Sequence, residues 1–260
     1  VNTRTENYRF KNGTIDEWMA KGMIDPLRYP NTDWYDIIMR DAEIQKYNIS
    51  ATGGNENSNY YMSVGVLDEK GLLINNDYTR YNARLNYDAK IRPNLKVGAR
   101  FSGNWSNMQY ALNDNFDGTI APSEMRYAIA GMTPYDPITG YYGGVMAYGE
   151  DPMAFNPYNA YNTQLTKQRR QEVNLSGFID WTPVKGLTAH LDYSLNYFND
   201  FRYKADTPSH SYNFQTNSLG SRAYVAENAG IYNYTNEGHK TQMTARLNYD
   251  ITVAEHHDIG

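Results

Sequence analysis

Four stretches of the chain alternate between apolar and polar residues with a period of two, which is the pattern of a β-strand with two different faces. They cover residues 78–89, 95–105, 187–197 and 241–253. In the first stretch, Leu85 falls on the apolar face, whereas Arg84 and Asn86 fall on the polar face. A shift of one residue would carry arginines onto the apolar face, so the pairing register of these strands is strongly specified.

Three weaker segments follow the same scheme. Residues 172–181 alternate except at Phe178, which falls among the polar positions. Residues 60–67 have apolar side chains at every second position, and residues 47–51 indicate a further strand before them. The pattern therefore predicts seven strands, and the segment from Asp258 onward suggests an eighth.

The connections between these strands alternate in length. Short turns are predicted at residues 54–59, 91–94, 182–186 and 254–257. Long loops are predicted at residues 69–77, 106–169 and 198–240. The long loops lie at the opposite end of the strands from the turns, and this one-sided arrangement is typical of an outer-membrane β-barrel. The sequence thus predicts a loop region with short helices over residues 1–44, which leads into barrel strands over residues 45–260.

Short helices are expected in two places between or before the strands. Thr14 and Glu17 have the spacing of a capping box, which predicts a helix at residues 15–21 that ends before Gly22. A second short helix is expected after Ser123. Neither helix carries residues that indicate a chemical role.

The predicted strands are long enough to cross a bilayer. Eleven residues, as in 187–197, extend about 28 Å along a barrel axis if each rises roughly 3.3 Å and the strand tilts about 40°. The apolar band of such barrels is about 25 Å tall. Aromatic residues gather at both strand ends, as in the girdles of membrane barrels: Tyr87, Trp181 and Tyr249 beside the turns, and Tyr81, Trp105 and Tyr197 beside the loops.

We therefore predict an all-β fold, an antiparallel transmembrane β-barrel segment with long extracellular loops. A soluble β-sandwich would show the same alternation, because its apolar faces turn inward toward a second sheet. Alternation alone does not separate the two folds. Strand length, one-sided loops and the paired aromatic belts favour the barrel.

Composition and charge narrow the class of protein further. The chain has 260 residues and no cysteine, which excludes a disulfide scaffold, a thiolate metal site and a cysteine nucleophile. A formal net charge of -5 argues against a nucleic-acid partner. The mean hydropathy is -0.74, and no stretch approaches the roughly 18 consecutive apolar residues of a membrane helix. A membrane strand needs no such run, so the low hydropathy does not argue against a barrel.

No catalytic or metal-binding constellation stands out. His190 and Asp192 lie two residues apart on one strand face, but no serine in a nucleophile elbow accompanies them. His256 and His257 are adjacent and lack the spacing of a helical zinc pair. We therefore expect no enzyme, no metal site and no cofactor. A glycosidase would need two carboxylates a defined distance apart, which a sequence does not show.

The long loops are rich in tyrosine beside Gly, Pro and Asn. Flat rings with neighbouring amides suit stacking on sugar faces, packing on a partner protein, or holding the loops together. The candidate contacts to substrate or to a covering partner are Tyr135, Tyr141, Tyr142, Tyr158, Tyr212 and Phe214.

A run of motifs resembles the SusC/RagA family of TonB-linked outer-membrane transporters of the Bacteroidetes. Residues 49–88 look like the early barrel region of that family. The resemblance rests on Asp33-Trp34-Tyr35-Asp36, Gly53-Gly54, Tyr60-Tyr61, Glu69-Lys70-Gly71, the strand Tyr81 to Asn86, Leu95-Lys96-Val97-Gly98, Asn156-Pro157-Tyr158 and His257-Asp258-Ile259. It is specific as a run of motifs and weakest in the long loops.

The resemblance implies a 22-stranded barrel filled by an N-terminal plug, with a TonB-contacting segment ahead of it. Neither the plug nor the contact segment is found in this sequence, so we expect the chain to be a segment of a longer protein. The family would place it in the bacterial outer membrane, importing oligosaccharides or peptides with a SusD-like lipoprotein lid and the TonB complex. The alternative is a soluble or surface-attached β-sandwich that binds glycan through its loops.

The polar faces of the strands would line the interior of such a barrel. Charges cost little there, whereas on the lipid side near the midplane they would cost about 2 to 4 kcal/mol each. The expected lining residues are Arg80, Arg84, Arg100, His190, Asp192 and Arg246. Barrels of the size that the resemblance implies are plugged, so contact with a plug is favoured over contact with solute in transit.

Overall fold

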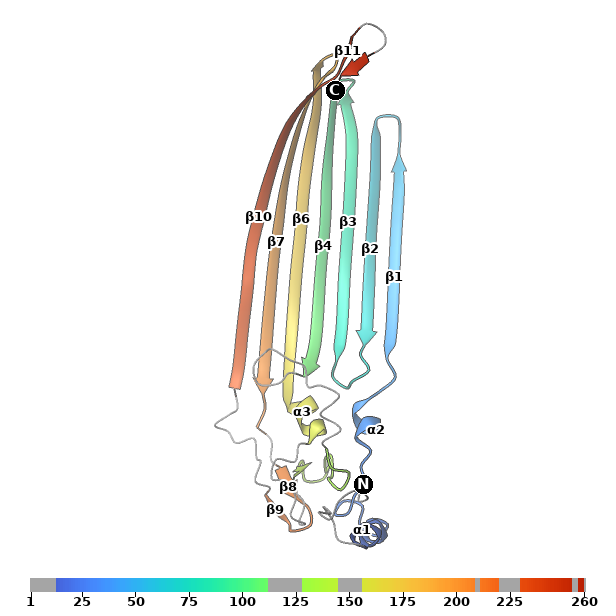
Figure 1. Ribbon diagram of the computed structural model, residues 1–260, viewed down its shortest axis with the longest axis vertical. Coiled ribbons are helices and arrows are strands. Elements are labelled where there is room, and N and C mark those ends of the chain that lie inside the picture. Colours follow the sequence, from blue (N-terminus) through green and yellow to red (C-terminus); the bar gives the residue numbers. More distant parts are fainter. Residues whose placement is uncertain are drawn as a thin grey trace.

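The computed structural model describes residues 13–111, 128–144, 156–208, 211–219, 230–253 and 257–259. Its main element is a seven-stranded antiparallel sheet with the order β1-β2-β3-β4-β6-β7-β10, so that neighbouring strands follow one another along the chain (Figure 1). The strands are β1 (Glu43–Gly54), β2 (Ser58–Lys70), β3 (Asp77–Arg92), β4 (Leu95–Ala111), β6 (Gln164–Val184), β7 (Leu187–Asp206) and β10 (Gly230–Tyr249). The predicted segment of an antiparallel barrel wall is thereby confirmed.

The pairing register keeps the alternating pattern continuous from strand to strand. Leu85 of β3 lies opposite Phe101 of β4, which lies opposite Leu175 of β6. One residue away, Arg84 lies opposite Ser102. Because successive side chains point to opposite faces, the sheet has one apolar and one polar face. We refer to them as the outer face and the lumen face.

The apolar side chains of the outer face are not covered by a second layer. Leu175 is 45% exposed, Met243 69% and Leu247 75%. A β-sandwich would bury such residues against another sheet. The other sheets among the described residues are small, namely β11-β12 and β5-β8-β9, and Figure 1 shows them at the two ends of the long strands.

The strands are longer than the alternating pattern predicted, and the connections are shorter. β4 continues to Ala111 and β6 already begins at Gln164, within the loop expected at 106–169. β7 and β10 extend likewise into the loop expected at 198–240. In these extensions both faces carry polar residues, so the period-two hydrophobic signal disappears although the pairing continues.

The end of the chain differs from the prediction in two ways. The strand expected at 241–253 ends at Tyr249, and Asp250 donates its N–H to the carbonyl of Gly186 at 2.8 Å. The expected eighth strand does not join the sheet, because β12 (His257–Ile259) pairs with β11 (Ile251–Val253). The turn predicted at 254–257 lies mostly outside the described residues.

A separate apolar core lies at the loop end of the sheet, around α2 (Trp34–Ile38) and α3 (Pro157–Thr163). Its buried members are Trp34, Ile38, Ala111, Met132, Ala160 and Tyr161. Each helix begins at a side-chain cap: Asp33 accepts from the N–H groups of Tyr35 and Asp36, and Asn156 accepts from that of Asn159. The long strands and this core together hold the segments 128–144 and 211–219 in position at the loop end of the sheet.

The helix expected at 15–21 is present as α1 (Thr14–Gly22), but its capping box is not. The N-cap is Gly13, with φ of 81° and no side-chain cap bond, so Thr14 lies inside the helix. Glu17 instead pairs with Lys21 at 2.6 Å. The helix expected after Ser123 lies outside the described residues. In the described part of the chain, no helix is long and apolar enough to cross a membrane.

Candidate functional site

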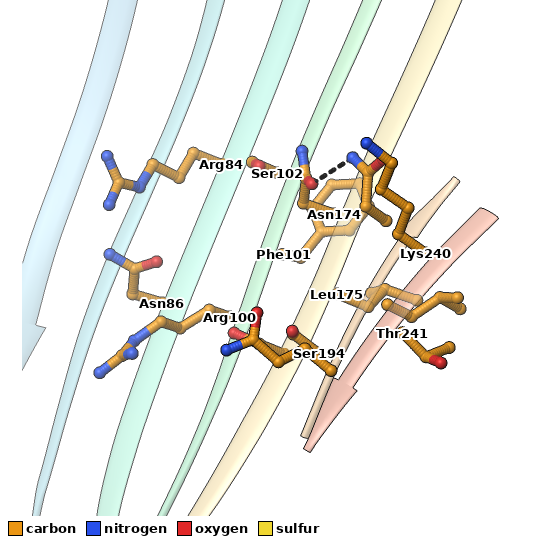
Figure 2. A pocket seen from close by; sticks show the side chains of 14 residues that line it. Arg84, Asn86, Arg100, Phe101, Ser102, Asn174, Leu175, Ser194, Lys240 and Thr241 are labelled. Atoms are coloured by element: carbon orange, nitrogen blue, oxygen red, sulfur yellow. Dashed lines mark hydrogen bonds between the residues drawn. The ribbon is translucent and has the colours of Figure 1, made fainter. Parts of the chain in front are cut away.

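The lumen face carries a hollow of about 890 Å³ across β3, β4, β6, β7 and β10. Arg84 and Arg100, both predicted to line the interior, project from neighbouring strands into the same side of this hollow (Figure 2). Asn196 donates its Nδ2 hydrogen to Oδ1 of Asn174 at 2.6 Å. Lys240 of β10 adds a further positive charge. The hollow therefore presents cations beside amides and hydroxyls.

A second hollow of about 450 Å³ lies on the lumen face toward the turn end of the strands. It brings together four of the predicted lining residues: Arg100, His190, Asp192 and Arg246. His190 does not bond to Asp192 on its own strand. Its Nδ1 lies 2.5 Å from Oδ1 of Asp180, its cross-strand neighbour on β6. This pair joins two strands and lacks a nucleophile, so it does not form a catalytic triad.

Phe178, the exception in the alternating pattern, faces the lumen and is buried. It lies opposite Gly98 of β4, where an added Cβ would meet the Phe178 ring at 2.0 Å. Gly98 therefore provides the space that the ring occupies. Lys96 and Arg100 lie 5.4 and 5.1 Å from the ring centroid, which favours cation–π attraction.

Arg80 lies on the lumen face nearer the loops, opposite Ser106. Its buried Nε has no hydrogen-bond partner among the described residues. At the same end, Asp200 accepts from Gln168 at 2.7 Å and from Arg202 at 3.2 Å. The pattern missed Gln168, Asp200 and Arg202 because they lie in the strand extensions.

Basic residues outnumber acidic ones on the lumen face of β3 to β10, although the whole chain has a net charge of -5. The basic positions are Arg80, Arg84, Lys90, Lys96, Arg100, Arg170, Arg202, Lys204, Lys240 and Arg246. The described acidic positions are Asp88, Glu172, Asp180, Asp192 and Asp200. This face therefore favours an anionic or acidic surface opposite it.

The six aromatic candidates of the loops form two groups of rings. Tyr135 and Tyr142 have ring centroids 5.0 Å apart, and each lies 6.3 Å from Tyr158. Burial raises the pKa of Tyr142. The second group stacks Tyr141 on Tyr212 at 4.8 Å and sets Tyr212 edge-on to Phe214 at 5.0 Å. The sequence neighbours Tyr141 and Tyr142 connect the two groups.

Two polar side chains that were not among the predicted site residues hold this aromatic cluster in place. The Asn156 amide donates to the carbonyl oxygens of Pro134 at 3.0 Å and Gly143 at 2.9 Å. The Asp136 carboxylate accepts from the Thr139 hydroxyl at 2.6 Å and from the N–H groups of Ile138 and Thr139. These bonds, with the Thr139 hydroxyl first, hold the pKa of Asp136 below its usual range.

In the part of the chain that the structure describes, no group of three His, Asp or Glu side chains is placed to hold a metal ion. The sheet forms a wall with two different faces. One face is apolar and exposed, the other is concave and charged, and the aromatic loop cluster lies at one end of the wall. This combination defines a segment of a membrane β-barrel.

Comparison with known proteins supports this class and specifies it. No protein-family model matches the chain. The TonB-dependent receptor P26 of Formosa agariphila is 25% identical over 240 residues, which cover 90% of this chain and 22% of that protein. The TonB-dependent receptor SusC of Bacteroides thetaiotaomicron is 24% identical, over 86% of this chain and 22% of its own length.

The fold is similar to that of solved structures of the RagAB peptide importer. In its closed-closed state the TM-score is 0.67 at 22% identity, and the match covers 89% of this chain and 25% of the RagAB chain. The chain is therefore similar in sequence to TonB-dependent receptors that include SusC, and similar in fold to the RagAB importer. It spans about a quarter or less of the length of these relatives.

Proposed function

We propose that this chain forms part of the barrel wall of an outer-membrane, TonB-dependent importer. The observation that carries the proposal is the seven-stranded sheet whose exposed outer face is apolar and whose concave face is charged. Its similarity to TonB-dependent receptors and to the RagAB fold supports the same role. The apolar face would contact lipid, and the protein would act as a transporter and not as an enzyme.

The lumen face would contact a plug domain outside residues 1–260. Its excess of positive charge favours an acidic partner surface, and Arg80, Arg84, Arg100 and Arg246 would supply the contacts. His190 and Asp192 would lie at the same interface, where the Asp180–His190 bond holds the imidazole in position.

The aromatic loop cluster would face the substrate or a SusD-like lipoprotein that covers the barrel. The substrate class is oligosaccharide or peptide, and the RagAB relatives are named as peptide importers. Tyr135 is 37% exposed, whereas Phe214 is 8% exposed. Tyr135 would therefore contact the substrate or the lipoprotein, and Phe214 would pack beneath the exposed rings and support them.

Fractionation of cells that express the full-length protein carrying this chain tests the location. We expect it in the outer-membrane fraction, extractable only with detergent. A protein that is soluble and monomeric without detergent would contradict the proposal.

Uptake of labelled peptides and labelled oligosaccharides, in cells with and without the gene, tests the activity and substrate class. We expect uptake of one class to depend on both the gene and an energised membrane. Neighbouring genes for peptidases or for glycoside hydrolases would indicate the class independently. Equal uptake of both classes without the gene would contradict an importer.

A photo-crosslinking residue tests the contact of the lumen face. At Ser102, on the lumen face, we expect an intramolecular crosslink to a segment outside residues 1–260. At Phe101, on the outer face, we expect none. Crosslinks from both positions, or from neither, would contradict a plug against this face.

A further inference from the structure

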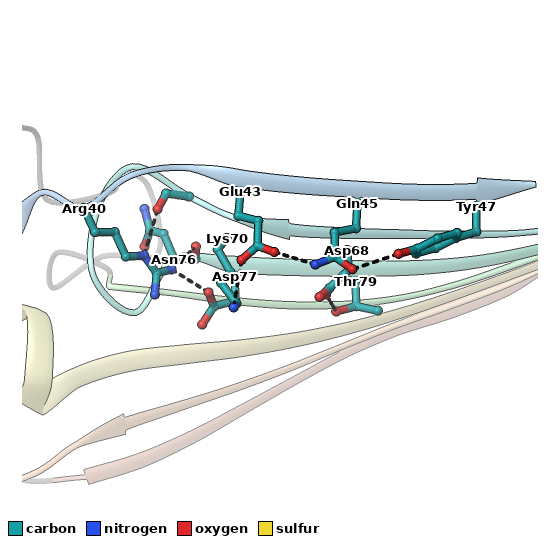
Figure 3. A network of polar contacts seen from close by, with 10 residues as sticks. Arg40, Glu43, Gln45, Tyr47, Asp68, Lys70, Asn76, Asp77 and Thr79 are labelled. Atoms are coloured by element: carbon teal, nitrogen blue, oxygen red, sulfur yellow. Dashed lines mark hydrogen bonds and ion pairs between the residues drawn. The ribbon is translucent and has the colours of Figure 1, made fainter.

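The outer face changes character beyond the loop-side aromatic girdle of Tyr81, Trp105 and Tyr197. On β1 to β3 it becomes a charged surface whose members pair with one another (Figure 3). Lys70 Nζ lies 3.1 Å from Glu43 Oε2, and Arg40 Nη2 lies 2.6 Å from Asp77 Oδ1. This side of the rim is therefore largely neutralised within the chain.

On β6 the same rim carries two cations without such partners. Lys167 and Arg169 are both exposed and lie two residues apart, so their side chains point to the same face. Their neighbours on β4 and β7 are neutral: Gln109 and Tyr203 beside Lys167, and Asn107 and Phe201 beside Arg169. Among the described residues, no carboxylate forms an ion pair with either cation.

An aromatic neighbour holds Arg169 without neutralising it. The guanidinium carbon of Arg169 lies 5.6 Å from the ring centroid of Phe201. This arrangement is favourable by cation–π attraction and leaves the donor fork of Arg169 available to an anion. Two acids on this face lie two strands away by register, and both have other partners. Asp77 of β3 is in line with Lys167 through Gln109 and pairs with Arg40 at 2.6 Å, and Glu237 of β10 accepts a hydrogen bond from Asn199 at 3.1 Å.

The depth of the pair relative to the girdle indicates the partner. Trp105 lies opposite Gln171, and Arg169 is two residues further toward the loops, or about 6.6 Å along the strand. Aromatic girdles lie at the level of lipid headgroups, so Lys167 and Arg169 lie at their outer edge. Arginine binds phosphate through two parallel hydrogen bonds, and lysine adds a point charge.

We propose that Lys167 and Arg169, with Phe201 and Tyr203, form a binding site for the phosphate headgroup of an outer-leaflet glycolipid. The proposal rests on the proposed function, because it requires the outer face to lie in the outer membrane. A bound lipid here would anchor the wall at a fixed depth, whereas the self-paired rim of β1 to β3 would not take part.

The test uses the full-length protein in nanodiscs of phosphatidylcholine that contain a small fraction of diphosphorylated lipid A. Bound lipid A is quantified by native mass spectrometry. The double variant Lys167→Gln/Arg169→Gln is compared with Arg170→Gln/Lys240→Gln, which removes the same amount of charge from the lumen face. Each basic side chain near an anionic surface contributes roughly fivefold, so we expect roughly thirtyfold weaker binding in the first variant and little change in the second.

Dephosphorylated lipid A separates recognition of phosphate from recognition of acyl chains. We expect it to bind the natural protein and the Lys167→Gln/Arg169→Gln variant equally weakly. Unchanged binding of the diphosphorylated lipid in that variant would overturn the site, as would equal losses in both variants. Loss of a co-purifying acidic protein, with lipid binding intact, would assign the cations to a protein partner and overturn the lipid site.

Fractionation of each variant keeps the two proposals apart. If the natural protein is absent from the outer membrane, the proposed function fails. If it is present there and the variants bind the lipid as it does, only the lipid site fails.

Discussion

Gly186 closes the hairpin between β6 and β7 with a backbone that other residues rarely adopt. Its φ is +86°, and an added Cβ would lie 2.3 Å from the carbonyl oxygen of Asp250. The same Gly186 accepts the N–H of Asp250 through its own carbonyl. This residue therefore connects the hairpin to the point where β10 ends.

Gly186→Ala is predicted to destabilise the protein by about 1 to 3 kcal/mol, because a side chain at positive φ is strained and this one also meets backbone. Urea unfolding of the full-length protein in lipid measures the change. The control is Lys185→Ala in the same turn, where the side chain is exposed and the expected change is within about 0.5 kcal/mol. Equal effects of the two substitutions would contradict the strain.

The Asp136 turn is predicted to loosen in acid. Because its hydrogen bonds lower the pKa of Asp136 in the folded state, its stabilisation is fully present above the unfolded pKa of about 3.9. The stabilisation is lost as the pH falls through the lowered folded value. Hydrogen exchange by mass spectrometry of the peptide around residues 136–144, corrected for intrinsic rates, should show protection that falls over this range.

Asp136→Ala supplies the comparison for this turn. It should be less protected at neutral pH and should show no further loss in acid, since the bonds to Ile138 and Thr139 are already gone. A variant with the same pH profile as the natural protein would contradict the role of the carboxylate.

At the scale of the strand, the decisive property is which face each position occupies. Pairing places Leu85 and Val97 on the outer face and Asn86 and Arg100 on the lumen face. Phe178 does not break this scheme, since the ring fills the space over Gly98 on the lumen side. The alternation is thus that of a wall with one apolar and one polar face, as the proposed membrane barrel requires.

Spin labels on the full-length protein in lipid test this assignment. Labels at Leu85 and Val97 should be accessible to oxygen dissolved in the bilayer, and labels at Asn86 and Arg100 should not. Leu85 and Asn86 serve as controls for each other, because consecutive residues lie at nearly the same depth in the bilayer. The reverse pattern would show that the register is shifted by one residue.

At the scale of the molecule, the sheet has two open edges. Among the residues that the structure describes, β1 pairs only with β2 and β10 only with β7. Unpaired backbone groups at a strand edge are not tolerated in lipid. In water they pair with other chains and promote aggregation. The wall is therefore stable only when further strands close it.

We predict that residues 1–260 expressed alone aggregate, whereas the full-length protein inserts into the outer membrane. Sedimentation in mild detergent and the heat-dependent shift in gel mobility of folded barrels measure the difference. The full-length protein from the same host is the control. A monodisperse, heat-modifiable product from residues 1–260 alone would contradict the need for closure.

The sequence by itself determined which segments form the alternating strands and which face each of their residues occupies. Within the bilayer, one side of each strand must be apolar and the other polar, so the positions of Leu85 and Arg84 carry this information locally. The run of motifs also indicated the similarity to TonB-dependent receptors. None of these conclusions required knowledge of which residues are distant neighbours.

Only the tertiary structure decided how far the strands continue and which side chains meet. Beyond the apolar band both faces are polar, so the extensions of β4 and β6 have no hydrophobic period to reveal them. The bond between Asp180 and His190 and the stacking of Tyr141 on Tyr212 join residues whose proximity depends on hairpin register and loop packing. These contacts follow from cross-strand geometry, which no local pattern specifies.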